Sequence, residues 1–506
     1  MEFFSDLSAN LGLGFGHAFT GANLFYCFVG VVLGTAIGVL PGLGPVATIA
    51  MLLPITFGLP PISSLIMLAG IYYGAQYGGS TTAILINLPG EASAVVTAID
   101  GYQLARQGQA GQALFTAAVG SFFAGTVATF LIAGFAPPLA SVALKFGPAE
   151  YFALMVLGLA ASIALAHGSL LKAIGMVLVG LLLGTIGQDL YTGAARFTFG
   201  YIVLTDGLNF VALAMGVFGL AEVIRNVEDE QRREVVVARV RNMLPSKDVL
   251  RSIVGPILRG TAFGSFVGIL PGGGAMLASF GAYSFEKRIS RNSAKFGKGA
   301  IEGVAAPEAA NNAGAQTSFI PMLTLGIPSN PVMALMIGAM IIQGIIPGPN
   351  VITEKADLFW AIVASMWIGN FMLLMLNLPL IGVWVKLLSV PYRMLFPAIM
   401  AMCCIGVYSI NNNPVDVYVM ALFGVIGYVL VRLDCEPAPL LLGFVIGQLL
   451  EEHLRRAMML SRGDPTIFFQ RPISALLLVL AIGSLLIVLL PSVSKKREEV
   501  FREESK

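Results

Sequence analysis

A glycine-rich stretch that ends in Leu-Pro-Gly occurs twice in this sequence and constrains its fold more than any other feature. The copies are residues 30–44, GVVLGTAIGVLPGLG, and residues 260–274, GTAFGSFVGILPGGG. In both, a glycine recurs every fourth residue, which lines one helix face and lets another backbone approach closely. Proline then removes a backbone donor and glycine permits positive φ. We therefore expect helix breaks at Pro41-Gly42 and Pro271-Gly272.

The composition places these broken helices in a membrane. Of the 506 residues, 57% are hydrophobic and 11% are charged, whereas soluble proteins carry about 25% charged residues. Because roughly 17–25 apolar residues span a bilayer, the apolar runs predict about 11 to 13 spans or half-spans. Lipid cannot satisfy the backbone groups that a break exposes, so breaks survive only inside the protein or along a cavity. Matching breaks in two halves are typical of the binding site of a secondary transporter.

A second interruption follows each glycine repeat. The polar cluster at residues 77–82 precedes Leu88-Pro89-Gly90, and the polar residues 311–317 precede Gly326-Ile327-Pro328. About ten residues between two breaks are too few to cross roughly 30 Å as a helix, so we expect re-entrant hairpins. The pattern predicts an all-α polytopic membrane protein with two repeats, broken helices and re-entrant hairpins. The predicted helix breaks are Pro41, Pro89, Pro271 and Pro328.

The distribution of Lys and Arg predicts that the repeats have inverted topology. Residues 1–105 contain neither, whereas residues 222–259 and 286–298 are rich in both. Cytoplasmic loops are enriched in these residues, so the second glycine repeat begins and ends on the cytoplasmic side and its twin does not. We expect a core that moves against a scaffold, elevator fashion. The predicted parts are a first repeat (1–221), a basic connector (222–259), a second repeat (260–450), a polar loop with a last span (451–490) and a charged cytoplasmic tail (491–506).

Polar side chains near the breaks are the candidate binding groups. An anion at mid-membrane needs hydroxyls, amides and helix N-termini, whereas a cation needs carbonyl and carboxylate oxygens. Alternatively, a Ser or Thr in an apolar helix bonds back to a carbonyl one turn earlier. The predicted substrate-binding residues are Ser80, Thr81, Thr82, Asn87, Ser93, Asn311, Asn312, Thr317, Ser329 and Asn330. The predicted ion-coupling residues are Gly42, Gly44, Gly272, Gly274 and Glu308.

Four acidic residues lie near the breaks: Glu91, Asp100, Glu302 and Glu308. A carboxylate at bilayer depth costs roughly 2.5–3.5 kcal/mol unless it is paired, and usually has a function. We interpret Glu91 as a helix cap and Asp100 as part of a polar loop over residues 100–112, which leaves Glu308 as the coupling candidate. The sequence shows no metal-ligand spacing, catalytic triad or ATP-binding motif, so we expect no metal, no enzymatic activity and no ATP dependence.

Several longer motifs resemble the large membrane subunit of the tripartite tricarboxylate transporters. They are GVLPGLG at 38–44, YGGSTTAIL at 77–85, DGYQLA at 100–105, EGVAAPEAANN at 302–312, LGIPS at 325–329 and GIIPGP at 344–349. The resemblance extends through nearly the whole chain. The motif residues of that family fall on Gly42, Ser80, Thr81, Asn87, Pro89, Gly272, Glu308, Asn311, Asn312 and Pro328.

The resemblance implies a bacterial inner-membrane protein with two partners, a small membrane subunit and a periplasmic solute-binding protein. It implies uptake of citrate or another carboxylate, driven by a Na⁺ or H⁺ gradient, with no cofactor beyond that coupling cation. We also expect contact with membrane lipid, no nucleic-acid partner, and a homodimer as an open possibility. The residues alone leave open a carrier that needs no binding protein and, less favoured, a channel.

Overall fold

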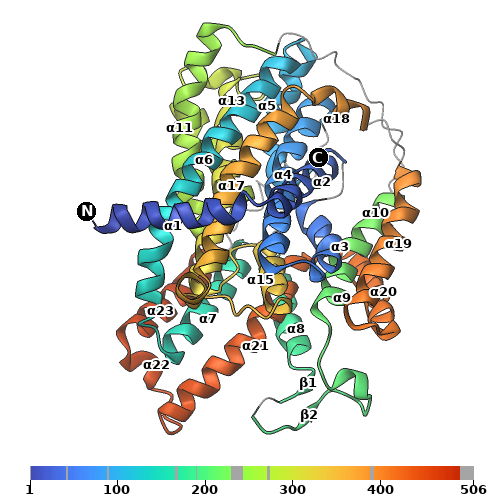
Figure 1. The fold of residues 1–506 in the computed structure, drawn as a ribbon, viewed down its shortest axis with the longest axis vertical. Helices are drawn as coiled ribbons and strands as arrows, with labels where there is room; N and C mark the ends of the chain where they lie inside the picture. Colours follow the sequence, from blue (N-terminus) through green and yellow to red (C-terminus); the bar gives the residue numbers. More distant parts are fainter. Residues whose placement is uncertain are drawn as a thin grey trace.

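The fold of this chain is helical almost throughout, as the composition predicts (Figure 1). The computed structural model describes residues 2–40, 44–87, 90–165, 169–189, 191–228, 243–270, 274–387 and 392–489. Five described helices have the length and apolar composition to cross a bilayer, and six shorter apolar helices accompany them. The five are α2 (Gly21–Val39), α6 (Ala110–Ala143), α11 (Lys247–Ile269), α17 (Ala356–Asn377) and α20 (Pro414–Arg432). The middle of the basic connector and the charged tail lie outside the described residues.

Both glycine repeats form helices that stop where the sequence predicts an interruption. α2 ends at Val39 and the next helix is α3 (Pro45–Phe57), while α11 ends at Ile269 and is followed by α12 (Gly274–Ile289). Gly274 has a φ of 53°, a left-handed value that glycine adopts readily. Pro41, Gly42, Pro271 and Gly272 themselves lie outside the described residues.

The glycine stripes bring two pairs of helices into backbone contact. α2 packs against α4 (Pro61–Ile86), and α11 packs against α13 (Glu302–Thr317). A Cβ on any stripe glycine would overlap a backbone carbonyl oxygen of the partner helix. These oxygens belong to Met67, Ile71 and Ala75 in the first pair and to Ala306, Ala310 and Gly314 in the second. The same close packing therefore occurs in both halves of the chain.

The re-entrant hairpin expected in the first half is not present as predicted. α4 runs unbroken for 26 residues through the polar cluster at 77–82, long enough to span about 39 Å. It ends at Asn87, which has a φ of 55°. The chain then forms η1 (Ala92–Ala94) and α5 (Val95–Arg106), which packs back against α4. The polar loop expected at 100–112 is wrong for the same reason, because α5 continues to Arg106 and α6 starts at Ala110.

The second half follows a similar plan. α13 leads into α14 (Phe319–Leu325), which ends at Gly326 with a φ of 71°. The break predicted at Pro328 is observed, since residues 326–330 are non-helical and α15 starts at Pro331 and ends at Ile342. α5 packs against α13, whereas α15 packs against α3 and α4, so each returning helix contacts the other half of the chain.

The remaining helices surround these pairs in three groups (Figure 1). One contains α7 (Pro148–Leu165), α8 (Leu170–Gly184), α21 (Pro437–Leu460), α22 (Ile467–Gln470) and α23 (Pro472–Leu489). The second contains α3, α9 (Phe210–Ala214), the π-helical turn η3 (Met215–Leu220), α10 (Ala221–Glu228), α19 (Tyr392–Asn411) and α20. The third pairs α1 (Glu2–Ala18) with α17. The shorter elements are η2 (Ile202–Leu204), η4 (Ser293–Lys295), α16 (Asn350–Glu354) and α18 (Ile381–Leu387).

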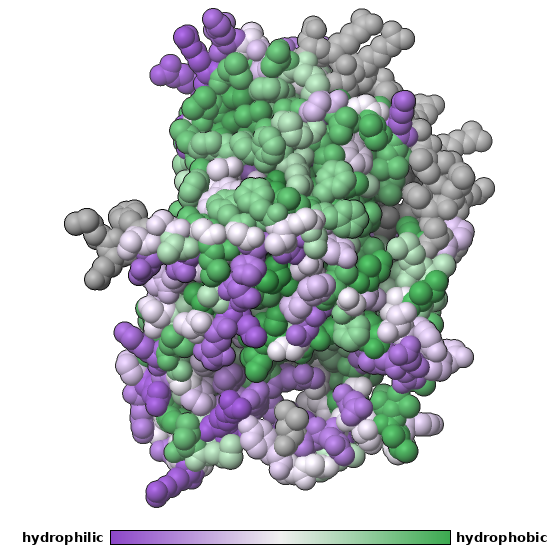
Figure 2. Space-filling view, in the orientation of Figure 1, coloured by the Kyte–Doolittle hydropathy of each residue, from purple (hydrophilic) through white to green (hydrophobic). Residues whose placement is uncertain are grey.

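Two details of the periphery differ from the prediction. The polar segment expected to be a loop from residue 451 continues α21 as a helix to Leu460. A short antiparallel hairpin, β1 (Gly187–Gln188) with β2 (Ala195–Arg196), follows α8 and was not predicted. In Figure 2 the upper half of the molecule is mostly hydrophobic, whereas hydrophilic residues gather below α1 and at the lower end, where the hairpin and α21 lie.

Candidate functional site

Described residues beside all four predicted interruptions line a single cavity of about 490 Å³. Gly44 lies at the first interruption, Glu91 to Ser93 at the second, Gly274 at the third and Ser329 with Asn330 at the fourth. Surrounding helices complete the wall through Ser162 of α7, Phe218 of η3 and the first turn of α21. The cavity therefore lies where the broken helices of the two halves meet one another and the helices around them.

Helix N-termini surround this cavity. The first residues of α3, α12, α15 and α21 all line it, and these helices have 13, 16, 12 and 24 residues. An α-helix carries roughly half a positive charge at its N-terminus, so converging N-termini favour an anion. Among the described lining residues there is no Lys, Arg or His, and the two acidic ones are Glu91 and Glu436.

The predicted site residues divide into two sets by position. Ser93, Ser329, Asn330, Gly44 and Gly274 line the cavity. Ser80, Thr81, Thr82, Asn311, Asn312, Thr317, Glu308 and Pro328 do not line it, although all eight are buried. Asn87 ends α4 in a left-handed conformation and does not line the cavity either. Gly42, Gly272 and the breaks at Pro41, Pro89 and Pro271 are outside the described residues.

Ser329 and Asn330 organise the start of α15 at the cavity. The side-chain oxygen of Asn330 accepts a hydrogen bond from the backbone N–H of Met333 at 3.0 Å, which caps the helix. The Asn330 amide donates to the Ser318 hydroxyl at 3.1 Å. The Ser329 hydroxyl donates to the Ser318 carbonyl at 3.4 Å. Ser318, the residue before α14, therefore supports the non-helical segment between α14 and α15.

A buried polar cluster lies directly behind the cavity wall. Ser80 of α4 donates its hydroxyl to Oε2 of Glu308 at 2.6 Å, and Thr97 of α5 donates to Oε1 of the same carboxylate. The amide of Asn312 donates to the Ser121 hydroxyl of α6 at 2.7 Å. Glu308 has no exposed surface. The hydroxyls thus hold a carboxylate at the contact between the two halves.

Three predicted threonines make only local hydrogen bonds within the described part of the chain. Thr82 donates to the Gly79 carbonyl at 2.9 Å and Thr317 to the Ala313 carbonyl at 2.9 Å. Thr81 approaches the Tyr77 carbonyl at 3.4 Å. These are bonds back to the preceding turn, the alternative to a binding role for a Ser or Thr in an apolar helix. Thr81 also borders a small void with Ser80 and Asn377.

The interpretations of Glu91 and Asp100 are both wrong. Glu91 precedes η1 but makes no capping hydrogen bond with its side chain, and it lines the cavity instead. Asp100 lies within helix α5 and has no exposed surface. Its Oδ1 accepts backbone N–H groups of Gly297, Gly299 and Ala300 at 2.8 to 2.9 Å, and its Oδ2 accepts the Tyr283 hydroxyl. Asp100 therefore ties α5 to the loop before α13.

Four polar residues of the wall were not predicted from the sequence: Tyr72 and Gln76 of α4, Ser162 of α7 and Glu436 before α21. Tyr72 and Gln76 lie four residues apart, one turn of helix, and Gln76 lies four residues before Ser80. A polar stripe of this spacing along an otherwise apolar helix is the signal that could have identified them. The helix break expected at residues 77–82 concealed this polar stripe, because a broken helix has no continuous face.

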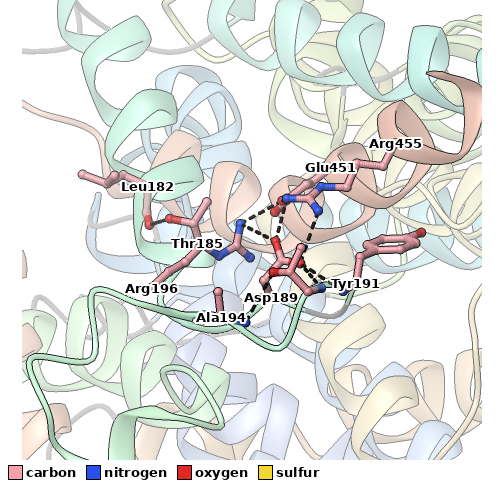
Figure 3. Close-up of polar contacts among 9 residues, drawn as sticks. Leu182, Thr185, Asp189, Tyr191, Ala194, Arg196, Glu451 and Arg455 are labelled. Carbon is pink, nitrogen blue, oxygen red and sulfur yellow. Dashed lines mark hydrogen bonds and ion pairs between the residues drawn. The ribbon is translucent and has the colours of Figure 1, made fainter. Parts of the chain in front are cut away.

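A network of charges holds the hairpin to α21 away from the cavity (Figure 3). Arg455 pairs with Asp189 at 2.6 Å and with Glu451 at 2.7 Å, and Arg196 also pairs with Glu451 at 2.8 Å. The backbone N–H of Thr192 and then that of Tyr191, together with the Arg455 guanidinium, hold the pKa of Asp189 well below its usual range. Since α21 begins at the cavity wall, this network fixes the far end of a wall helix.

The chain is similar to known proteins over most of its length. The sequence profile described as "Tripartite tricarboxylate transporter TctA family" matches residues 24–442. An "Uncharacterized 52.8 kDa protein in TAR-I ttuC' 3'region" from Agrobacterium vitis is 66% identical over 499 residues, 99% of both chains. An "Uncharacterized protein in TAR-II ttuC' 3'region" of the same organism is 65% identical over 241 residues, 48% of this chain and all of that one. No solved structure matches this chain significantly.

Proposed function

This chain belongs to the tripartite tricarboxylate transporter TctA family, and we propose that it imports a small carboxylate solute by symport with Na⁺ or H⁺. The observation that carries the proposal is the cavity on which four helix N-termini converge. Without a Lys or Arg among the described lining residues, a carboxylate would be held by backbone dipoles and the neutral groups of Ser93, Ser329 and Asn330. A coupling cation would supply the remaining positive charge.

The proposed partners are a small membrane subunit and a periplasmic solute-binding protein in the bacterial inner membrane. The family assignment supports this proposal, because the match extends over most of the chain. The exposed apolar residues on α19 and α20, such as Ile405, Tyr418 and Val425, are suited to contact with lipid or with the small subunit.

The proposed mechanism is an elevator movement of two inverted repeats. Its support is the repeated glycine packing of α2 on α4 and of α11 on α13, with each returning helix crossing to the other half. Close backbone packing makes each pair a rigid unit. The pairs would move together against α7 and α21, which complete the cavity wall, and against α8, which packs on α21. Crosslinking Val332→Cys of α15, which packs on α4, to Ala438→Cys of α21 should block uptake, since both residues line the cavity and the two helices are in contact; undiminished uptake would contradict the movement.

Uptake by proteoliposomes tests the proposed function. The chain is reconstituted with the small subunit and supplied with the binding protein, and labelled citrate, malate and benzoate are compared under a Na⁺ gradient, a pH gradient and none. We expect saturable accumulation of at least one carboxylate that needs a gradient and all three proteins. Uptake that is unchanged without the binding protein would indicate an independent carrier. Flux that never saturates and needs no gradient would indicate a channel.

A further inference from the structure

Glu91 presents a carboxylate to a cavity that otherwise favours anions. Its side chain belongs to the wall, and only 7% of the residue is exposed. Among the described residues it forms no ion pair. A charged carboxylate removed from water without a counter-charge is costly, and it repels a second carboxylate that enters the same space. Glu91 therefore opposes substrate binding whenever it is charged.

The hydrogen bonds around Glu91 contain more acceptors than donors. A single hydroxyl, that of Ser93, lies between Oε1 of Glu91 and Oε1 of Gln76, which is 3.0 Å away. Asn311 donates one amide N–H to Glu91 at 3.3 Å. The other end of that amide, Oδ1 of Asn311, is fully buried and has no hydrogen-bond partner among the described residues. A buried unpartnered acceptor is costly, so the cluster lacks a hydrogen or a positive charge.

The charged and titratable groups around Glu91 do not supply that charge. Tyr72 and Glu436 line the same cavity, and the helices packed against η1 carry Tyr77, Glu308 and the hydrogen-bonded pair of Asp100 and Tyr283. All of these are neutral or acidic, and the basic residues of the same helices, Arg106, Lys287 and Arg288, are exposed. A neighbouring buried carboxylate such as Glu308 adds to the cost of a charge on Glu91.

A proton fits this cluster better than a metal cation. Hard cations take several oxygen ligands, and the Asn311 amide points an N–H group at Glu91 instead. A proton requires one carboxylate oxygen and leaves the N–H of Asn311 in a favourable bond.

We propose that Glu91 carries the coupling proton of this transporter, an inference that rests on the proposed function and specifies its ion. One proton from the aqueous side converts the Glu91 carboxylate to the neutral acid, and only then does the carboxylate solute occupy the cavity. After the movement, the solute leaves, and the proton returns to water on the other side. One proton and one solute therefore cross together, and the charged empty site rejects solute.

Infrared difference spectroscopy of the reconstituted chain tests the proton on Glu91 without any substrate. We expect the wild type to show a carboxylic-acid C=O band that appears as the buffer is acidified. Glu91→Gln should lose that band, whereas Glu302→Gln, a buried glutamate outside the cavity, should keep it. A band that survives unchanged in Glu91→Gln would overturn the assignment, whatever the transport result.

A transport arm separates this proposal from the proposed function. With the binding protein and small subunit present, Glu91→Gln should still exchange labelled citrate or malate across the membrane, but lose accumulation driven by a pH gradient. Glu91→Asp should restore part of that accumulation. If Glu91→Gln accumulates solute in response to a pH gradient as the wild type does, Glu91 does not carry the coupling proton. Wild-type accumulation that is driven by a Na⁺ gradient alone would contradict proton coupling as well. If wild-type protein with the expected band transports no carboxylate, the proposed function fails and the proton site stands.

Discussion

Ser80 and Glu308 lie 228 residues apart in the sequence and share a hydrogen bond of 2.6 Å between a hydroxyl and a carboxylate oxygen. The bond joins α4 of the first half to α13 of the second, directly behind the cavity wall. Thr97 of α5 donates to the same carboxylate, so three helices meet at one acidic group. Substitutions at these residues should therefore affect the packing of the two halves against each other as well as solute binding.

Asn312→Ala should reduce uptake about tenfold while the protein still folds. The amide of Asn312 bridges α13 to Ser121 of α6, and a buried hydrogen bond is worth roughly 0.5–1.5 kcal/mol. Ser461→Ala is the matched control, because among the described residues the Ser461 hydroxyl, just after α21, bonds only to the Met458 carbonyl. Initial rates of labelled solute uptake, normalised to protein in the liposomes, measure both. Equal rates for the two variants would show that the cluster behind the wall has no part in transport.

Thr81→Ala provides a second test of the predicted site. The Thr81 hydroxyl borders the small void beside Ser80, and among the described residues it makes only a weak approach to the Tyr77 carbonyl. If Thr81 contributes to transport, uptake should fall well below that of Ser461→Ala at the same expression. Wild-type uptake would assign Thr81 to helix packing alone.

Gly264→Ala should destabilise the protein by about 1–3 kcal/mol, the usual cost of overpacking. Its Cβ would overlap the carbonyl oxygen of Ala310, so α11 and α13 must separate. Gly12→Ala on α1 is the control, since nothing lies within 4 Å of its Cβ. Thermal unfolding in detergent should show a lower midpoint for Gly264→Ala than for Gly12→Ala. Identical midpoints would mean that the stripe does not hold the pair together.

Asn330→Ala should lower both stability and solute affinity, since Asn330 caps α15 and lines the cavity. Loss of an N-cap costs about 1 kcal/mol. Asn330→Ser keeps a capping oxygen but loses the amide that donates to Ser318, so it should recover the unfolding midpoint and not the affinity. A variant that recovers both would assign Asn330 to the cap alone.

Asp100→Ala should destabilise the contact between α5 and the loop before α13. It leaves three backbone N–H groups without their acceptor, and the buried one, that of Ala300, costs about 1–3 kcal/mol when unsatisfied. Limited proteolysis around residues 290–300 should accelerate, and the unfolding midpoint should fall. Asp206→Ala, at an exposed loop position, should leave both unchanged. An unaltered cleavage rate in Asp100→Ala would contradict the role of Asp100 as a tie.

Asp189→Asn should be less stable than the wild type at neutral pH, and the difference should vanish in acid. The Thr192 and Tyr191 N–H groups and Arg455 depress the pKa of Asp189 in the folded state. A carboxyl group with a depressed pKa stabilises the folded state at pH values above its unfolded-state pKa of about 3.9. This stabilisation is lost as the pH falls toward the folded-state pKa. Unfolding midpoints of both proteins across pH measure this, with exposed Asp6→Asn as the control. A difference that persists unchanged in acid would contradict the network.

The fold and the site differ in how far the sequence predicts them. Composition, glycine spacing and the Leu-Pro-Gly motifs identify a membrane protein with interrupted helices, because these signals are local. The re-entrant hairpin was mispredicted because polarity at residues 77–82 suggested a break. The structure keeps that cluster within one buried helix, where Ser80 meets Glu308 of the other half. A polar residue in an apolar helix signals a partner, and the sequence does not say which.

The sequence by itself determined that backbone breaks and polar groups must be sheltered from lipid, since this follows from hydrogen bonding alone. Only the tertiary structure decided that four helix starts surround one cavity, that Glu91 belongs to its wall, and that Asp100 is a buried tie. The periodicity of a helix defines its polar face. Which faces meet depends on the packing of residues hundreds of positions apart, and this packing gives each carboxylate its surroundings.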